Sequence, residues 1–168
     1  MKKILSLVIV VFALGSCSQD LKFNNEAVFQ GVKDNLFWRG ADAKATSSVT
    51  EEKLIISAGT LNESVALNMP MPANFVNSKD EDTYVTYTLG TSLDKTATYS
   101  FSDDVTTYTY ESGANFGDGQ IVITEWDGAF ISGTFRFNVK NTDPDSEAPE
   151  TVNMQSGVFY KIPVVSIL

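Results

Sequence analysis

The sequence contains no histidine and a single cysteine, Cys17. Without histidine the chain lacks the commonest general base, the commonest metal ligand and any Ser-His-Asp triad. With one thiol it has neither a disulfide within the chain, nor a Cys-His nucleophile, nor a zinc site built from several thiolates. We therefore expect a domain that is stable through its core alone.

Positive charge is also scarce. The chain has 12 Lys and Arg against 21 Asp and Glu, which gives a net charge of −9. This balance argues against nucleic-acid binding, which needs basic patches, and against docking on anionic lipid heads through protein charge. We interpret the acidity as a source of solubility.

Long apolar runs are limited to one, residues 4–14, which only Ser6 interrupts. Eleven residues of helix rise about 16 Å, roughly half of a hydrocarbon core of about 30 Å. Lys2 and Lys3 precede the run, and the small residues Gly15 and Ser16 follow it. This pattern predicts a removable signal segment rather than a membrane span.

Leu14-Gly15-Ser16-Cys17 resembles the lipobox of bacterial lipoprotein precursors, in which the cysteine is lipidated and becomes the first residue of the mature chain. The alternative is an ordinary secretory signal that contains a cysteine. The resemblance implies fatty-acyl chains such as palmitate on Cys17, so that the membrane is a partner through this residue. The expected location is the cell envelope, at the outer membrane, with the periplasmic or surface face left open.

The predicted organisation has three parts: a signal peptide at residues 1–16, a lipidated Cys17 with a short polar tether at residues 17–25, and one β domain at residues 26–168. Removing residues 1–16 from the 168-residue chain leaves 152 residues, enough for one domain with a sizeable core. It also removes Lys2 and Lys3, which takes the net charge from −9 to −11.

No helical period of three to four residues persists beyond the leader, whereas alternating patterns recur. The expected strands are residues 27–33, 36–39, 54–57, 65–69, 83–89, 97–101, 106–110, 121–126, 129–140, 151–155 and 158–165. Turn residues separate them every eight to twelve positions. We predict an all-β fold, a single antiparallel β-sandwich of about ten short strands. An up-and-down, lipocalin-like barrel is the alternative.

Two hairpin turns are the clearest local signals, Asp34-Asn35 and Asp127-Gly128. On the strand after the second turn, one face carries Ala129, Ile131, Gly133, Phe135, Phe137 and Val139. Gly133 suggests a bulge or a close backbone approach, and Pro163 suggests an edge position for the last strand. Alternation places Trp126 on the face of Val122 and Thr124, opposite Ile121 and Ile123.

Carboxylates are the remaining candidates for catalysis. Glycosidases need two carboxyl groups about 5–10 Å apart, and the candidates are Glu125, Asp127, Asp103 and Asp104. Residues 143–147 and 80–82 are acidic runs that lack the spacing of a calcium-binding loop. Turns and solvated loops explain these residues more simply. We therefore expect no catalytic residue, no metal and no cofactor.

Aromatic residues on predicted strands are the better candidates for ligand contact. Trp38, Trp126, Tyr108 and Tyr110 can stack on a sugar ring or contribute to a protein interface if they are exposed. As core residues, they would simply fill the interior.

Several segments together resemble a family of uncharacterised Bacteroidota envelope lipoproteins that carries a domain-of-unknown-function label. They are the lipobox and residues 29–34, 37–38, 119–124, 131–137 and 157–159. The resemblance implies a fold and a location without any catalytic residue. We expect a lipid-anchored, non-enzymatic binding or accessory module with an envelope protein or a glycan as partner. The alternatives are a barrel holding a small apolar ligand and a carboxylate-based glycan hydrolase.

Overall fold

The computed structural model describes residues 27–103, 105–143 and 145–167, so that Cys17 and the predicted leader and tether lie outside the described residues. These residues form ten strands and one short 3₁₀ helix, which confirms the predicted all-β fold. In chain order they are β1 (Val28–Lys33), β2 (Leu36–Ser48), β3 (Lys53–Gly59), β4 (Glu63–Pro70), η2 (Glu81–Thr83), β5 (Val85–Leu89), β6 (Thr96–Ser102), β7 (Thr107–Glu111), β8 (Asp118–Trp126), β9 (Phe130–Asn141) and β10 (Thr151–Ile167).

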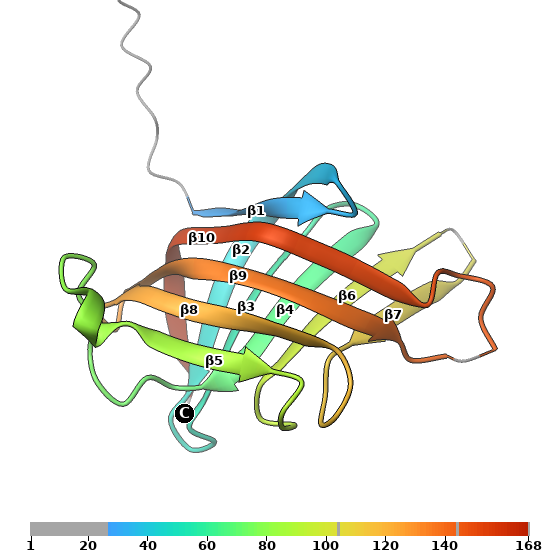
Figure 1. Ribbon diagram of the computed structural model, residues 1–168. Coiled ribbons are helices and arrows are strands. Elements are labelled where there is room, and N and C mark those ends of the chain that lie inside the picture. The colour runs from blue at the N-terminus through green and yellow to red at the C-terminus, as the bar shows by residue number, and fades with distance from the viewer. Residues whose placement is uncertain (1–26, 104, 144, 168) are drawn as a thin grey trace, which may run out of the picture.

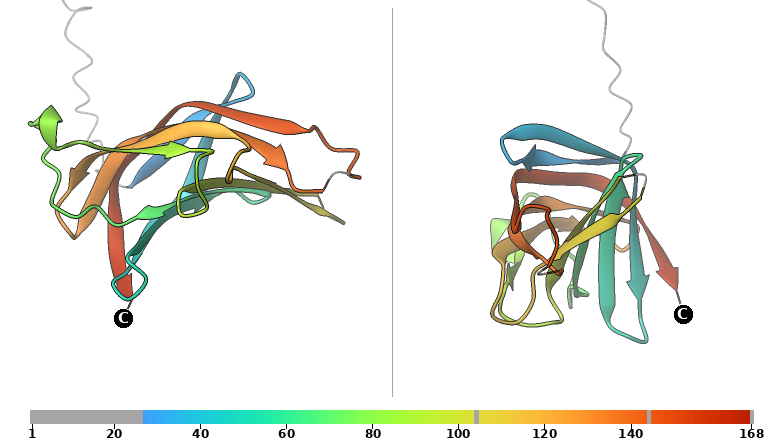
Figure 2. Two further views of the ribbon diagram at one scale, coloured as in Figure 1. Left: turned by 60° about the horizontal axis from the view of Figure 1, so that its bottom comes forward. Right: turned by 90° about the vertical axis from the view of Figure 1, so that its right-hand side faces the viewer.

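The strands lie in two facing layers (Figures 1 and 2). One layer has the order β5-β8-β9-β10-β1, and the other has the order β2-β3-β4-β6-β7. Both layers belong to one continuous ten-stranded sheet, because β1 and β10 also pair with β2 and β7 also pairs with β9. The facing layers are a feature of the predicted sandwich, whereas the hydrogen bonding from one layer to the other is a feature of the barrel alternative. All pairings are antiparallel except that of β10 with β2.

Both predicted hairpin turns are confirmed. Asp34 and Asn35 have φ of 47° and 68°, the left-handed conformation that a two-residue hairpin turn requires, and they join β1 to β2. Gly128 has φ of 88°, and Asp127 Oδ1 accepts hydrogen bonds from the backbone N–H of Ala129 and Phe130. Local turn chemistry therefore fixes the register of β1 with β2 and of β8 with β9.

Bulges explain where simple alternation fails. The β8–β9 register shifts between Ile123 and Glu125, so one extra residue moves Trp126 to the other face of its strand. Trp126 is buried like Ile121 and Ile123, and the predicted grouping of Trp126 with Val122 and Thr124 is wrong.

β10 contains two bulges where two separate strands were expected. Its register shifts between Met154 and Gly157 and again between Phe159 and Ile162. Each shift contains a residue in the left-handed region, Ser156 with φ of 51° and Lys161 with φ of 48°. The strand continues through both bulges to Ile167 and is the longest in the sheet.

The edge position predicted from Pro163 is wrong, because β10 lies within the sheet, between β9 on one side and β1 and β2 on the other. Pro163 is tolerated because pairing with β1 ends at Tyr160 and pairing with β2 begins at Val164. The missing N–H thus falls in the gap between two neighbours.

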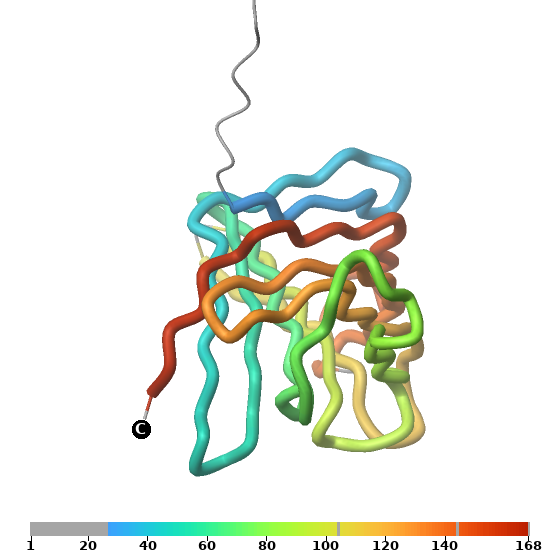
Figure 3. The backbone as a smooth tube through the Cα atoms, turned by 90° about the vertical axis from the view of Figure 1, so that its left-hand side faces the viewer, coloured from blue at the N-terminus to red at the C-terminus, as the bar shows by residue number. Residues whose placement is uncertain are grey.

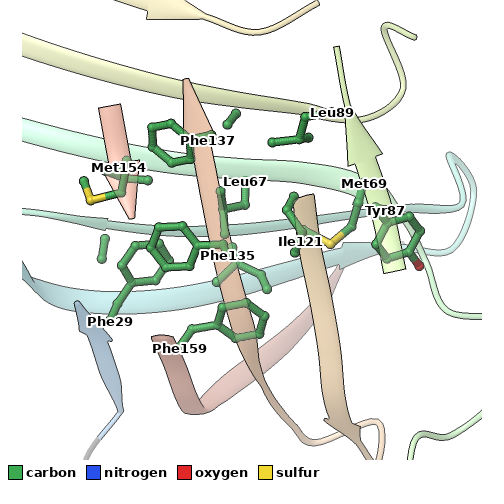
Figure 4. Packing of buried hydrophobic residues seen from close by; sticks show 14 of the residues in the cluster. Phe29, Leu67, Met69, Tyr87, Leu89, Ile121, Phe135, Phe137, Met154 and Phe159 are labelled. Atoms are coloured by element: carbon green, nitrogen blue, oxygen red, sulfur yellow. The ribbon is translucent and has the colours of Figure 1, made fainter. Parts of the chain in front are cut away.

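The core fills the space between the layers with alternate residues of the strands (Figure 4). Phe29, Phe135 and Phe159 lie together, with ring centroids 4.8 to 6.5 Å apart. Gly133 makes room for this cluster, as a Cβ there would lie 2.1 Å from the Val122 carbonyl oxygen and 2.4 Å from the Phe159 ring. The close backbone approach expected at Gly133 is confirmed.

Candidate functional site

Four polar or amphipathic side chains meet where the end of β1 crosses β4 and β6. Lys33 comes from β1, Trp38 from β2, Glu63 from the start of β4 and Tyr99 from β6. Lys33 and Glu63 form an ion pair, and their side chains are only 21% and 18% exposed. Since β1 and β4 belong to opposite layers, this polar cluster links the two layers.

Three donors surround the Glu63 carboxylate. Lys33 Nζ and Tyr99 Oη both donate to Oε1, the latter at 2.8 Å, and Trp38 Nε1 donates to Oε2. Lys33 Nζ also lies 2.9 Å from Tyr99 Oη and 5.0 Å from the centre of the Tyr99 ring. The partly buried charges of Lys33 and Glu63 are therefore paired with each other and hydrogen-bonded.

This environment changes two proton affinities. Burial alone raises the pKa of the Glu63 carboxyl, but hydrogen bonds from Lys33, Tyr99 and Trp38 and the charge of Lys33 together lower it below the usual 4.5. Burial, and then the hydrogen bond to Glu63 and its negative charge, raise the pKa of Tyr99 well above the usual 10.0. At neutral pH the cluster thus contains a carboxylate and a neutral phenol.

Chemically, the cluster is suited to holding the fold rather than to transferring protons. A general acid or base needs a pKa close to the working pH, and both shifts move away from neutrality. A glycosidase also needs a second carboxyl group across a cleft, and no other described carboxyl group hydrogen-bonds within this cluster.

Two of the four predicted ligand-contact aromatics contribute to this region. Trp38 is 5% exposed and donates to Glu63, while Tyr110 is 3% exposed and packs against Tyr99 with ring centroids 5.7 Å apart. Tyr108 stacks on Phe101 at 6.2 Å. These aromatics pack within the domain rather than forming one exposed platform.

The fourth aromatic, Trp126, is buried elsewhere. It is 6% exposed and forms an isolated backbone bridge with Val76. Sequence reasoning missed Lys33, Glu63 and Tyr99, because they come from separate strands and no local motif connects them.

The predicted carboxylate candidates separate in the structure. Asp127 and Asp103 each close a turn by accepting two backbone N–H groups, which lowers their pKa. Glu125 accepts a hydrogen bond of 3.1 Å from Ser132 Oγ. Asp104 lies outside the described residues.

The acidic runs likewise have local roles. Asp80 Oδ1 accepts from the N–H of Asp82 at the start of η2, and Asp143 Oδ1 accepts from the N–H of Asp145. Within residues 27–103, 105–143 and 145–167, no three side chains of the metal-binding types gather as a candidate metal site. A surface pocket of about 450 Å³ beside the second run is lined by Lys140, Asn141, Asp143, Ser146, Ala148 and Glu150.

The fold and the polar cluster define an all-β domain whose two layers are linked through a partly buried ion pair. The model of a family described as a domain of unknown function, DUF6252, matches residues 25–163. Since the match spans most of the chain, the protein belongs to this family. Searches of curated proteins and of solved structures found no match. None of the described residues form a helix long and apolar enough to cross a membrane.

Proposed function

We propose that the protein is a lipid-anchored module of the Bacteroidota cell envelope that binds or supports a partner without catalysing a reaction. The observation that carries the proposal is Cys17, the only cysteine, behind a short apolar run and two lysines. Lipid chains on Cys17 hold the domain at a membrane, since each buried methylene contributes about 0.8 kcal/mol and several chains act together.

The packing of the domain favours an outer surface as the place of binding. The interior between the layers is filled by buried side chains such as Phe29, Phe137 and Phe159, each 0% exposed. A protein that stores a small apolar ligand needs an apolar internal cavity instead. The pockets found at the surface are lined largely by polar residues. An internal apolar ligand is therefore the weaker alternative.

A carboxylate hydrolase has less support still. Asp127 and Asp103 are committed to turns, and Glu125 lies beside Ser132 without a second carboxylate among its hydrogen-bond partners in the described chain. The net charge of −9 disfavours nucleic acid, which leaves an envelope protein or a glycan as the proposed partner.

Labelling with a radioactive or clickable fatty acid tests the anchor. We expect label on the wild type and on Ser16→Ala, which keeps a small residue before the cysteine, and no label on Cys17→Ala. The unlabelled variant should accumulate as precursor or leave the membrane fraction. Label on Cys17→Ala, with retention in membranes, would contradict lipidation at this residue.

Crosslinking of the intact lipoprotein in cells, combined with a glycan array probed with the purified protein, tests the binding role. We expect either one recurrent crosslinked envelope protein or one glycan class. Hydrolysis of a bound glycan that is lost in Glu125→Gln but not in Glu147→Gln would overturn the non-enzymatic assignment.

A further inference from the structure

Four of the most exposed apolar side chains lie in, or directly after, three neighbouring turns. Leu36 and Phe37, at the β1–β2 turn, are each 70% exposed, Leu61 of the β3–β4 turn is 100% exposed and Val105 of the β6–β7 turn is 93% exposed. We refer to these four residues as the turn-tip cluster. Turn residues are ordinarily polar, so exposed apolar side chains in and directly after three adjacent turns are unusual.

Direct contacts place the three turns next to one another. Lys33, just before the β1–β2 turn, pairs with Glu63, just after the β3–β4 turn. The N–H of Ser102, just before the β6–β7 turn, donates to the carbonyl of Asn62 at 2.8 Å. Figure 1 shows the three turns on the same side of the molecule, toward its upper right.

Each tip is held on a closed turn. Asp34 and Asn35 form a two-residue turn, and the N–H of Thr60 donates to the Glu63 carbonyl at 2.7 Å. Asp103 Oδ1 accepts from the N–H of Val105 at 2.9 Å and of Thr106 at 2.7 Å. Preorganised turns lose little conformational entropy when their apolar tips are buried by a partner.

The reach of the chain from Cys17 indicates which partner this is. Nine residues lie between Cys17 and Ala27, and the ten steps from one to the other span at most about 33–36 Å when the chain is fully extended. β1 has six residues and is therefore only about 20 Å long, so the turn at its far end is within reach of the bilayer that holds Cys17. A bilayer is the one apolar partner that lipidation brings to every copy of the protein.

We infer that the turn-tip cluster docks against the bilayer surface, so that the domain is oriented on the membrane rather than suspended from it. This inference rests on the proposed lipidation of Cys17. The tips enter the interfacial region of uncharged or zwitterionic headgroups, because Asp34 and Asp103 beside them disfavour anionic ones.

The exposed apolar residues Val49, Leu93 and Ile167 lie in another part of the molecule, around the β2–β3 turn. Val49 at the β2–β3 turn and Ile167 at the end of β10 adjoin the exposed carboxylates Glu51 and Glu52. Leu93 lines a surface pocket with the same two carboxylates and Asp94. Figure 3 shows the β2–β3 turn and the end of β10 projecting away from β1, where the described chain begins.

The test uses cysteines introduced at the tips of the full-length, lipidated protein. Acylation occupies Cys17, so that an environment-sensitive fluorophore reacts only at Phe37→Cys, Leu61→Cys or Val105→Cys. Phe75→Cys and Leu93→Cys are matched controls, since these side chains are 72% and 73% exposed. After reconstitution into phosphatidylcholine vesicles, we expect blue-shifted emission and quenching by a lipid-bound quencher at positions 37, 61 and 105, and neither at 75 and 93.

Emission typical of water at all five positions would overturn the inference, as would equal quenching at tips and controls. Protection of the tips only after an envelope protein is added would also overturn it. Mass spectrometry of the same preparation shows whether Cys17 carries acyl chains, and so distinguishes failure of bilayer docking from failure of lipidation. Acyl chains on Cys17 with unquenched tips refute bilayer docking alone, whereas an unmodified Cys17 refutes the proposed function.

Discussion

The polar cluster around Glu63 and the aromatic cluster around Phe135 hold the same fold by different physics. In the first, Lys33 and Glu63 join opposite layers through charge and hydrogen bonds. In the second, Phe29, Phe135 and Phe159 fill space, and Gly133 provides that space. The two are neighbours, with the Trp38 and Phe29 rings 6.0 Å apart. One depends on protonation and partner geometry, whereas the other depends on volume alone.

The largest expected loss of stability comes from a substitution in the aromatic cluster. Gly133→Val forces a Cβ against the Val122 carbonyl and the Phe159 ring, and we expect a loss of about 3 kcal/mol in the free energy of unfolding, measured by urea denaturation. The exposed neighbour Thr134→Ala is the control, with an expected change within about 0.5 kcal/mol. Equal stability of Gly133→Val and the wild type would show that the backbone approach there is relaxed.

Breaking the polar cluster comes next. Glu63→Ala leaves Lys33 without its partner, and we expect a loss of about 2 kcal/mol, less than for a fully buried pair because the Lys33 and Glu63 side chains are 21% and 18% exposed. The double variant Lys33→Met with Glu63→Leu should recover part of this loss. Strict additivity in a double-mutant cycle would mean that the two side chains do not interact.

Lowering the pH should weaken the stabilising contribution of the polar cluster and leave that of the aromatic cluster unchanged. The folded pKa of Glu63 lies below the unfolded value of 4.5, so its stabilising contribution is fully present above pH 4.5 and is lost as the pH falls through the folded pKa. The stability difference between the wild type and Glu63→Gln should therefore shrink as the pH falls below 4.5 and through the folded pKa. The difference between the wild type and Phe135→Ala should stay constant over this range. Parallel pH dependence of both differences would refute the assignment.

The smallest effect is expected at a turn outside both clusters. Asp127→Ala removes an acceptor from the N–H groups of Ala129 and Phe130, which should cost about 1 kcal/mol in thermal or urea unfolding. Asp127→Asn keeps an acceptor oxygen and should lose less. If Asp127→Ala lost more stability than Glu63→Ala, the turn would stabilise the fold more than the polar cluster does, contrary to this prediction.

Local features were predictable from the sequence, and cross-layer features were not. Asp34-Asn35 and Asp127-Gly128 encode their turns in two residues, and the alternation of residues 131–139 encodes a buried face. The polar cluster joins Lys33 to Glu63 and Tyr99, which lie 30 and 66 positions further along the chain. The cluster forms only when the two layers pack against each other, and the alternation of residues along a single strand does not predict that packing.

Bulges set the second limit on prediction. A bulge inverts the alternation on one side of itself, so alternation alone places Trp126 on the wrong face and divides β10 into two strands. The left-handed residues that form the bulges of β10 are Ser156 and Lys161, neither of which is a glycine or an asparagine. Composition therefore gives no warning of them.

The position of β10 has a consequence for when the domain can form. The last strand of the chain is an inner strand of the sheet, and its partners include β1 and β2, the first two. These contacts close the longest loops in the chain and are the slowest kind to form. The sheet therefore stays incomplete until β10 has been made and pairs with β9, β1 and β2.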